Sequence, residues 1–368
     1  MVEKFDIDVF VIGGGPAGLA AAIGARRKGF RVALADGAKP PIDKACGEGL
    51  MPDALEATRL LGVSLPPLEG AYFRGIRFLG SGVSVAADFP VGAGWGIRRT
   101  VLHRILVEEA ESSGVELHWD TTVTALEGNR VHFRRGSVTA RWIVGADGGQ
   151  SRVRKWIGLD SGARVSSRYG FSRHYRIAPW TDFVEVYWGQ GFQIYVTPLA
   201  VNEVCVALIS RDPHHRLEHA LPEFPELQSR LDGAIVSAGD RGGLSVSRCL
   251  RAVYRGAAVL IGDASGSVDA VTGEGICLAF QQAHAWADAA EREDLSQYQS
   301  AHRAILQRHR LMSAMLLTLD RWPALRRRVL RAFSARPELF SRMLATHVGD
   351  TRLTDIAAAG FALGLELL

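Results

Sequence analysis

The chain has 368 residues, of which 47% are hydrophobic and 22% charged, and these proportions are typical of a globular protein and exclude a disordered or fibrous one. Its net charge of +4 is the small excess of 43 Lys and Arg over 39 Asp and Glu, which is too small to indicate nucleic-acid binding. The length predicts two domains, and the four scattered cysteines and 11 histidines show none of the spacings of a disulfide framework or a metal site.

The sequence also lacks the usual targeting signals. No N-terminal segment has the order of basic, apolar and small residues of a signal peptide, and no apolar run reaches the length of a membrane span. Together with the unpaired cysteines, this predicts a cytoplasmic location.

The predicted elements begin with a βαβ unit. Residues 6–12 form an apolar run typical of a parallel strand buried on both faces, residues 17–28 predict a helix, and residues 30–35 predict a second strand. All three fit within about 30 residues, which is the length of the unit that opens a Rossmann domain.

The middle of the chain predicts a second sheet. Residues 72–90 alternate as antiparallel strands do, and residues 100–113 have the apolar spacing of a helix. Residues 142–146 predict a buried strand that returns to the first domain. Residues 168–210 contain several segments with a period of two, which indicates a separate antiparallel sheet suited to carrying a substrate.

The last third predicts one more strand at residues 257–261, a helix at about 274–290 and helical structure from residue 296 onward. Within it, residues 308–333 read RHRLMSAMLLTLDRWPALRRRVLRAF and are both amphipathic and basic. This pattern predicts either weak contact with a membrane surface or packing on the protein's own domain.

A glycine motif follows the first strand. The spacing G-x-G-x-x-G falls on Gly13, Gly15 and Gly18, where the three glycines permit a tight turn, close approach of a pyrophosphate and packing of helix on strand. Asp36 ends the second strand and is placed to bind the ribose of an adenosine half. The motif therefore predicts a dinucleotide site at the helix N-terminus.

Two later segments specify the dinucleotide. Residues 142–154 read WIVGADGGQSRVR and residues 259–276 read VLIGDASGSVDAVTGEGI. With the first motif, they resemble the FAD-binding signatures of the para-hydroxybenzoate hydroxylase group, a superfamily that includes aromatic monooxygenases, flavin halogenases and geranylgeranyl reductases. The resemblance covers residues 5 to about 290.

The resemblance implies an α/β fold: a Rossmann-like FAD-binding domain of the glutathione reductase type, with an inserted antiparallel β-sheet substrate domain and C-terminal helices. The expected FAD-binding domain is discontinuous and comprises residues 1–70, 98–165 and 248–300. Residues 71–97 and 166–247 are expected to form the substrate domain, and residues 301–368 the C-terminal helical region.

The resemblance also implies roles for individual residues. Asp263 is expected to accept hydrogen bonds from the ribityl chain of FAD, and Arg99, with help from Arg98, to meet its phosphates. A D-G-x-x-S-x-x-R motif, which braces FAD and in the family is linked to the pyridine nucleotide, falls on Asp147, Gly148, Ser151 and Arg154. The full set of expected cofactor-binding residues is Gly13, Gly15, Gly18, Asp36, Lys44, Cys46, Arg99, Asp147, Gly148, Asp263, Gly273, Gly275 and Ile276.

The segment TGEGI has a physical role of its own. Gly273 and Gly275 open a helix whose N–H groups are expected to point at the flavin pyrimidine ring, where negative charge gathers on reduction. Glu274 is expected to be an ordinary first-turn helix residue rather than a catalyst.

Cys46 and Tyr195 are the candidate catalytic residues. The segment PPIDKACGEGLMP resembles the P-x-x-x-C-G-G element of geranylgeranyl reductases, with Glu48 in place of the second glycine. The thiol is expected to line the active site, with Lys44 lowering its pKa; the alternative is a small buried residue in a turn. In GFQIYVTP, residues 191–198, Phe192 and Tyr195 either stack on the substrate or belong to the sheet core.

Weaker candidates for the site are Arg173 and His174 in the segment SRHYR. Two positions depart from the subfamily patterns, since Ala270 replaces the proline usual before TGEG and Gly266 replaces a histidine common in the hydroxylases. These departures place the chain between the hydroxylases and the reductases.

These inferences predict an FAD-dependent oxidoreductase, with NADPH or NADH as a transient reductant because no second Rossmann motif is evident. The favoured reaction is monooxygenation of an aromatic, polyketide-like or other lipophilic small molecule. The alternatives are a geranylgeranyl-reductase-like reduction of carbon–carbon double bonds, a halogenase, which the missing W-x-W-x-I-P motif disfavours, and a non-enzymatic flavoprotein. Neither a metal ion nor a nucleic acid is expected as a partner, and the sequence carries no signal for the oligomeric state.

Overall fold

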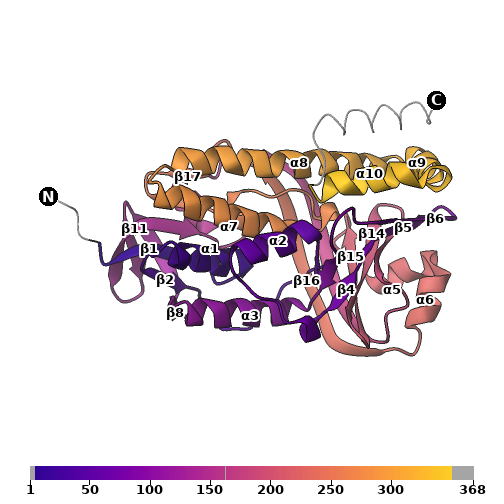
Figure 1. Cartoon of the computed structure of the whole chain (residues 1–368), viewed down its shortest axis with the longest axis horizontal. Helices are drawn as coiled ribbons and strands as arrows, with labels where there is room; N and C mark the ends of the chain where they lie inside the picture. Colours follow the sequence, from indigo (N-terminus) through magenta and orange to yellow (C-terminus); the bar gives the residue numbers. More distant parts are fainter. Residues whose placement is uncertain (1–4, 162, 350–368) are drawn as a thin grey trace.

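The protein consists of two sheets that lie side by side, with a layer of long helices along one side of both (Figure 1). The computed structural model describes residues 5–161 and 163–349. The ends of the expected first and last segments, residues 1–4 and 350–368, therefore lie outside the described residues, as does residue 162.

The first sheet has eight strands in the order β17-β18-β11-β1-β2-β8, with β9 and β10 extending it beside β11. β1 pairs in parallel with β2 and β11, and β11 pairs in parallel with β18, as the two-sided apolar pattern predicts. The strands are β1 (Ile7–Ile12), β2 (Val32–Ala35), β8 (Glu116–His118), β9 (Val123–Glu127), β10 (Arg130–Phe133), β11 (Ser137–Gly145), β17 (Tyr254–Arg255) and β18 (Ala258–Leu260).

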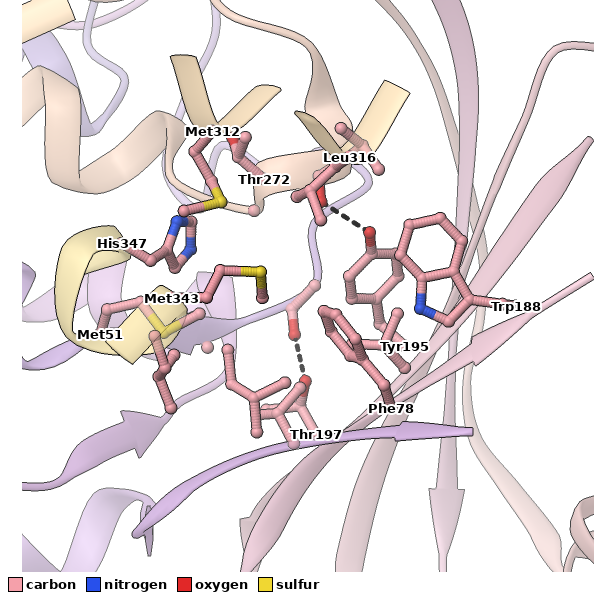
Figure 2. Close-up of a pocket in the computed structure, with 18 of the residues that line it drawn as sticks. Met51, Phe78, Trp188, Tyr195, Thr197, Thr272, Met312, Leu316, Met343 and His347 are labelled. Atoms are coloured by element: carbon pink, nitrogen blue, oxygen red, sulfur yellow. Dashed lines mark hydrogen bonds between the residues drawn. The ribbon is translucent and has the colours of Figure 1, made fainter. Parts of the chain in front are cut away.

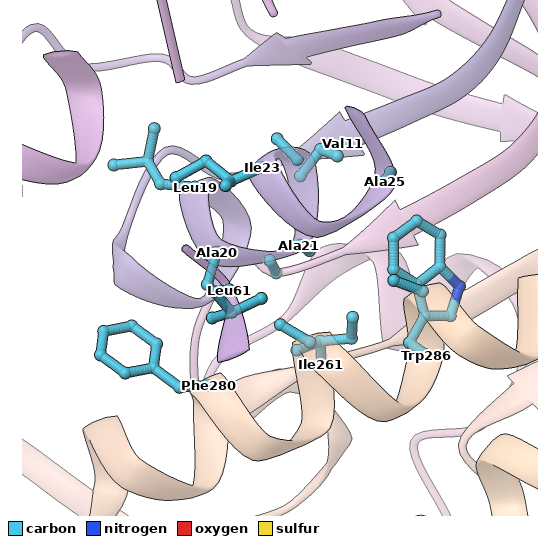
Figure 3. Close-up of a cluster of buried hydrophobic side chains, with 14 of the residues drawn as sticks. Val11, Leu19, Ala20, Ala21, Ile23, Ala25, Leu61, Ile261, Phe280 and Trp286 are labelled. Atoms are coloured by element: carbon cyan, nitrogen blue, oxygen red, sulfur yellow. The ribbon is translucent and has the colours of Figure 1, made fainter. Parts of the chain in front are cut away.

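Helices α1 and α7 pack on this sheet and on each other through small side chains. A methyl group on Gly24 of α1 would lie 3.3 Å from the Cβ of Ala287 on α7, so the two backbones approach closely. Figure 3 shows Leu19 and Ile23 of α1 in the same buried cluster as Phe280 and Trp286 of α7. The helices around this sheet are α1 (Pro16–Arg27), α2 (Pro52–Leu60), α3 (Arg99–Ser112), α4 (Arg152–Trp156) and α7 (Gly275–Glu291).

The second sheet has seven strands in the order β16-β12-β15-β14-β13-β5-β6. Its pairings are antiparallel, as predicted, except that β13 and β5 run parallel. The strands are β5 (Gly75–Gly80), β6 (Val83–Asp88), β12 (Ala163–Arg176), β13 (Phe183–Trp188), β14 (Phe192–Ala200), β15 (Glu203–Ser210) and β16 (Ile235–Cys249).

Smaller elements complete the fold. A small sheet has three strands in the order β3-β7-β4. In the sequence, β3 and β4 lie between β2 and β5, and β7 lies between β6 and β8. Its strands are β3 (Gly49–Leu50), β4 (Ala71–Phe73) and β7 (Gly94–Gly96), and the short helices are η1 (Pro67–Glu69), α5 (Leu217–Ala220), η2 (Leu221–Glu223), α6 (Pro225–Leu231), η3 (Gly262–Ser265) and η4 (Ala270–Thr272).

The C-terminal helices are α8 (Leu295–Arg321), α9 (Pro323–Ala335) and α10 (Pro337–His347). The apolar residues of the amphipathic segment 308–333 pack against β5, β6 and β13, where they form one cluster with Phe78, Val186 and Trp188. The amphipathic pattern thus corresponds to packing on the protein's own sheet. Among the described residues, no helix combines the length and apolarity needed to cross a membrane.

Candidate active site

The glycine turn after β1 packs tightly against other protein atoms on one side and faces open space on the other. Gly13 has φ +113°, and a Cβ there would lie 2.5 Å from the carbonyl oxygen of Ala146; a Cβ on Gly18 would lie 1.8 Å from the oxygen of Gly13. A Cβ on Gly15 would meet no atom within 4 Å. Both tight positions require glycine for packing, whereas Gly15 leaves room for a ligand at the N-terminus of α1.

A cavity of about 320 Å³ lies beside this turn. Seven of the predicted cofactor residues line it: Gly13, Gly15, Asp36, Lys44, Arg99, Asp147 and Gly148. The carboxylate of Asp36 is already fixed, because it accepts hydrogen bonds from the backbone N–H groups of Gly14 at 2.7 Å and Ala38 at 2.8 Å. The structure therefore brings together residues from four separated stretches of the sequence.

His103 supports the glycine turn and was missed by the sequence reasoning. It is fully buried on α3, and its Nε2 donates to the carbonyl oxygen of Gly14 at 2.8 Å. Burial lowers the pKa of His103, so the ring is neutral and its tautomer is set by this hydrogen bond. The available signal was spacing, since His103 lies one helical turn after Arg99 and faces the same way.

The two neighbouring arginines at the start of α3 have different surroundings. Arg99 lines the cavity, and its Nε is buried without a hydrogen-bond partner. Arg98 instead pairs with Glu203 of the second sheet at 3.1 Å. The expectation that Arg98 shares the phosphate contact is wrong, because adjacent residues at a helix start point in different directions.

Arg154 braces the loop that carries Gly148. Its guanidinium is buried and donates to Asp160 at 2.7 Å, to the carbonyl of Ala264 at 3.1 Å and to the carbonyl of Gly149 at 2.9 Å. Asp147 caps α4 through Oδ2, while its Oδ1 is buried and has no hydrogen-bond partner. Arg154 therefore acts on the protein itself, and Asp147 retains an acceptor for a ligand.

The remaining predicted cofactor residues lie outside the 320 Å³ cavity. Asp263 is exposed in η3, and its Cβ would lie 4.0 Å from a Cβ on Gly149. Gly273 has φ +72°, and added Cβ atoms on Gly273 or Gly275 would meet nothing within 4 Å. Helix α7 begins at Gly275, so its free N–H groups, with that of Ile276, lie next to open space.

The surroundings of Cys46 correct one expectation. The thiol is half-buried, its sulfur accepts a hydrogen bond from the N–H of Glu48 at 3.3 Å, and burial raises its pKa even though Arg99 opposes the shift. Lys44 does not activate the thiol; its Nζ lies 3.2 Å from the position of a Cβ on Gly148. Cys46 is therefore a neutral thiol at neutral pH rather than a thiolate.

Glu48 fastens the turn that follows Cys46. Its buried carboxylate accepts from the N–H of Arg99 at 2.8 Å and lies 2.6 Å from Nε2 of His174 on β12. His174 thus connects the Cys46 turn to the second sheet, while Arg173 points to the surface and pairs with Asp240. Sequence reasoning identified His174 only as a weak candidate, because its partner lies more than a hundred residues away.

A second, narrow cavity of about 60 Å³ lies between the second sheet and the C-terminal helices (Figure 2). Its walls extend from Gly47 and Gly49, next to Cys46, to Gly273 before α7. Its other lining residues are Met51, Ile76, Phe78, Val184, Val186, Trp188, Tyr195, Thr197, Val271, Thr272, Met312, Leu316, Phe340, Met343, Leu344 and His347.

Tyr195 belongs to this apolar cavity, and Phe192 does not. The hydroxyl of Tyr195 donates to the carbonyl of Val271 at 2.7 Å, and burial raises the pKa of this phenol. Phe192 is fully buried in a separate cluster on the other face of β14 with Tyr187 and Leu208. Of the two alternatives for Phe192, the sheet core is the one that the structure shows, because residues three apart on a strand face opposite ways.

These features together define a flavoprotein of the oxidoreductase class. The open glycine turns and the unpartnered Nε of Arg99 and Oδ1 of Asp147 suit an extended dinucleotide with a diphosphate. The chain belongs to the FAD binding domain family, whose match covers residues 6–216. The protein is an FAD-dependent oxidoreductase.

Individual relatives have low sequence identity to this chain. A menaquinone reductase of Mycolicibacterium smegmatis is 28% identical over 357 residues, which cover 86% of this chain and 85% of the relative. A putative 2-heptyl-3-hydroxy-4(1H)-quinolone synthase of Rhodococcus erythropolis is 28% identical over 377 residues, covering 94% and 97%. A geranylgeranyl bacteriochlorophyll reductase-like protein of Thermoplasma acidophilum has a similar structure, with a TM-score of 0.77, 20% identity and coverage of 98% and 97%.

Other solved structures are equally similar in fold. A flavoprotein/dehydrogenase from Cytophaga hutchinsonii has a TM-score of 0.80 at 19% identity over 93% of both chains. A flavin-dependent brominase has a TM-score of 0.80 at 18% identity over 98% of both chains. At such identities these similarities establish the fold and leave the reaction open.

Proposed function

We propose that this flavoprotein is an NAD(P)H-using monooxygenase that hydroxylates a lipophilic small molecule. The observation that carries the proposal is the apolar cavity. Its walls include Gly273, from the segment expected to face the flavin ring, and Gly47, which follows the cysteine expected to line the active site. A substrate held there would react in a site that excludes water, and this protects oxygen chemistry from side reactions.

In this proposal the 320 Å³ cavity holds the adenosine and diphosphate part of FAD. Gly15 and the N-terminus of α1 bind the diphosphate, and Arg99 supplies positive charge beside it. Asp36 binds the adenosine ribose, Asp263 binds the ribityl chain, and the N–H groups of Gly275 and Ile276 meet the flavin ring. Bound FAD supplies the two-electron chemistry and the reaction with oxygen.

The chain's own residues prepare the substrate site. The hydroxyls of Tyr195 and Thr197 donate to the backbone carbonyls of Val271 and Gly47, each at 2.7 Å. These bonds fix both glycine-bearing loops against β14 and leave a largely apolar surface facing the cavity. The substrate is therefore positioned by packing against apolar side chains, with Met51, Met312 and Met343 as adaptable parts of the wall.

A second candidate function is the reduction of a carbon–carbon double bond. The neutral thiol of Cys46 favours it, because such a reduction needs a proton donor and a thiol with a raised pKa holds its proton at neutral pH. Relatives named menaquinone reductase and digeranylgeranylglycerophospholipid reductase support this candidate as well.

One experiment separates the two functions. The FAD-loaded protein is incubated with NADPH or NADH and a panel of aromatic and prenylated compounds, while oxygen uptake is recorded and products are identified by mass spectrometry. A monooxygenase consumes oxygen with substrate and adds one oxygen atom to it. Products that gain two hydrogen atoms without matching oxygen uptake would refute the monooxygenase and establish the reductase; reactions without substrate serve as the control.

A further inference from the structure

The apolar cavity contains one polar group next to Gly273 that the proposed function does not use. His347, at the end of α10, lines the cavity and is almost fully buried, and its Nδ1 has no hydrogen-bond partner. The hydroxyls of Tyr195, Thr197 and Thr272 are all bonded to backbone carbonyls. Trp188 also has a buried, unpartnered Nε1, but Figure 2 shows it on the opposite side of the cavity from His347.

Glu274 lies next to His347, and His309 is hydrogen-bonded to Glu274. Nε2 of His347 lies 3.5 Å from Oε1 of Glu274, and Oε2 of Glu274 makes a short hydrogen bond with Nδ1 of His309 on α8. Nε2 therefore lies at ion-pair distance from Glu274 without a hydrogen bond to it, and Nδ1 of His347 remains without a partner. A buried polar atom without a partner costs free energy, which a ligand that bonds to it would recover.

The cluster of Glu274, His309 and His347 is also electrically neutral at neutral pH. Burial raises the pKa of Glu274 to about 8 and lowers that of His309 to about 4, and burial also lowers the pKa of His347. Asp53 is close to Glu274 and His309, but Nη2 of Arg308 pairs with Asp53 at 2.8 Å and lies 3.2 Å from Nε2 of His309. The cluster therefore suits a neutral polar group and not an ion.

We propose that His347, which lies next to the hydrogen-bonded pair of Glu274 and His309, is a specificity-determining residue that hydrogen-bonds one hydroxyl or carbonyl oxygen of an otherwise apolar substrate. This inference rests on the proposed function only in taking the apolar cavity as the substrate site. Substrates of this class consist of an apolar body with a single oxygen-bearing end, which is directed toward the segment Thr272–Gly273. A fully apolar compound of the same shape would leave Nδ1 unpartnered and bind less tightly.

The test compares two probes of nearly equal shape, 1-naphthol and 1-methylnaphthalene, by isothermal titration calorimetry on the FAD-loaded protein without reductant. Both probes are larger than the empty cavity, so each enters only when the flexible side chains of Met51, Met312 and Met343 move aside. We expect wild-type protein to prefer 1-naphthol about 5- to 10-fold, which is the range of one net hydrogen bond. The variants are His347→Asn, whose amide lies near the position of Nδ1, and His347→Gln, whose amide lies near the position of Nε2. His284→Gln, on a partly exposed face of α7, is the matched control.

We expect His347→Asn to keep the preference for 1-naphthol and His347→Gln to lose it, although both retain a polar side chain beside Glu274. His284→Gln should bind both probes as the wild type does. Equal binding of the two probes by the wild type, or a preference that survives in His347→Gln, would overturn the proposal, as would the absence of binding of either probe.

The outcome is independent of the reaction class. If the probes fail to discriminate while NAD(P)H oxidation still consumes oxygen and yields hydroxylated product, the subsite is wrong and the monooxygenase stands. If His347 discriminates between the probes but no oxygen enters any product, the subsite stands and the monooxygenase is wrong.

Discussion

Replacing Glu274 by Gln should remove a pH-dependent loss of stability. Glu274 is fully buried and its pKa is raised from 4.5 to about 8, so the folded protein holds this proton where the unfolded chain has released it. A carboxyl whose folded pKa is raised destabilises the fold increasingly as pH rises from its unfolded pKa to its folded pKa. Gln keeps the shape and a hydrogen bond to His309 but does not titrate.

The clearest window for this effect lies between pH 6.5 and 8. His309 and His347 are neutral in the folded protein in this window, because burial lowers their pKa values below 6.5, whereas in the unfolded chain they still release protons near pH 6.5. This contribution is the same in the wild type and in Glu274→Gln, so the difference between the two proteins reports Glu274 alone. Over these 1.5 pH units, at about 1.4 kcal/mol per unit, the wild type should lose about 2 kcal/mol of unfolding free energy relative to Glu274→Gln.

The assay is urea unfolding of both proteins at several pH values and a fixed FAD concentration, since bound FAD itself adds stability. Glu338→Gln, at an exposed position of α10, is the control and should parallel the wild type. If the difference between wild type and Glu274→Gln stays constant from pH 6.5 to 8, Glu274 is ionised throughout in the folded protein and the reasoning is refuted.

Substitutions at three further positions test the cofactor and substrate sites. Asp263→Ala should weaken FAD binding about 10- to 100-fold in equilibrium dialysis, because ribityl hydroxyls lose a charged acceptor; unchanged affinity would remove Asp263 from the site. His103→Phe leaves the carbonyl of Gly14 unpartnered and should lower the unfolding free energy by about 1–3 kcal/mol, whereas His103→Gln should retain most of it; equal losses would contradict the role of Nε2. Cys46→Ser should leave FAD binding intact and change the rate of a monooxygenase only slightly, while a loss of turnover of about 100-fold without oxygen uptake would identify the thiol as the proton donor of a reductase.

The parts of the site that follow local backbone rules could be predicted from the sequence. Gly18 is required by its contact with the oxygen of Gly13, five residues earlier, and Gly13 by its φ of +113°; the further contacts of Gly13, with Ala146 and Asp147, come from a distant part of the chain. The strands β1, β2 and β18 and the helices α1, α3 and α7 begin and end within about two residues of their predicted positions, because hydrophobic periodicity and the glycine turns set their limits. β11 begins five residues earlier than predicted, and β8, β9, β10, β17, α2 and α4 were not predicted. A motif whose residues determine their own backbone conformation can be predicted from the sequence without knowledge of the rest of the fold.

Side-chain pairing could not be predicted in the same way. Glu274 looked like an ordinary helix-start residue because His309 and His347, which bury it, lie on two other helices. Lys44 is adjacent to the Cys46 turn in sequence yet contacts the loop of Gly148, while Arg99, 53 positions after Cys46, is the charge that acts on the thiol. Such contacts depend on how the two sheets and the C-terminal helices pack, and a single sequence carries no direct signal of that packing.

Glu48, which stands in place of the second glycine of the C-G-G element, has an unusual backbone conformation. It has φ +59°, the left-handed conformation that glycine adopts more readily than other residues. A non-glycine residue pays about 1–2 kcal/mol for this conformation, and the hydrogen bonds of its carboxylate to Arg99 and His174 are each of comparable size or larger. Glu48 therefore adopts a conformation that glycine takes readily and connects the turn to the second sheet. The choice between the two reactions depends on the chemistry of the Cys46 thiol and of the cavity next to this turn.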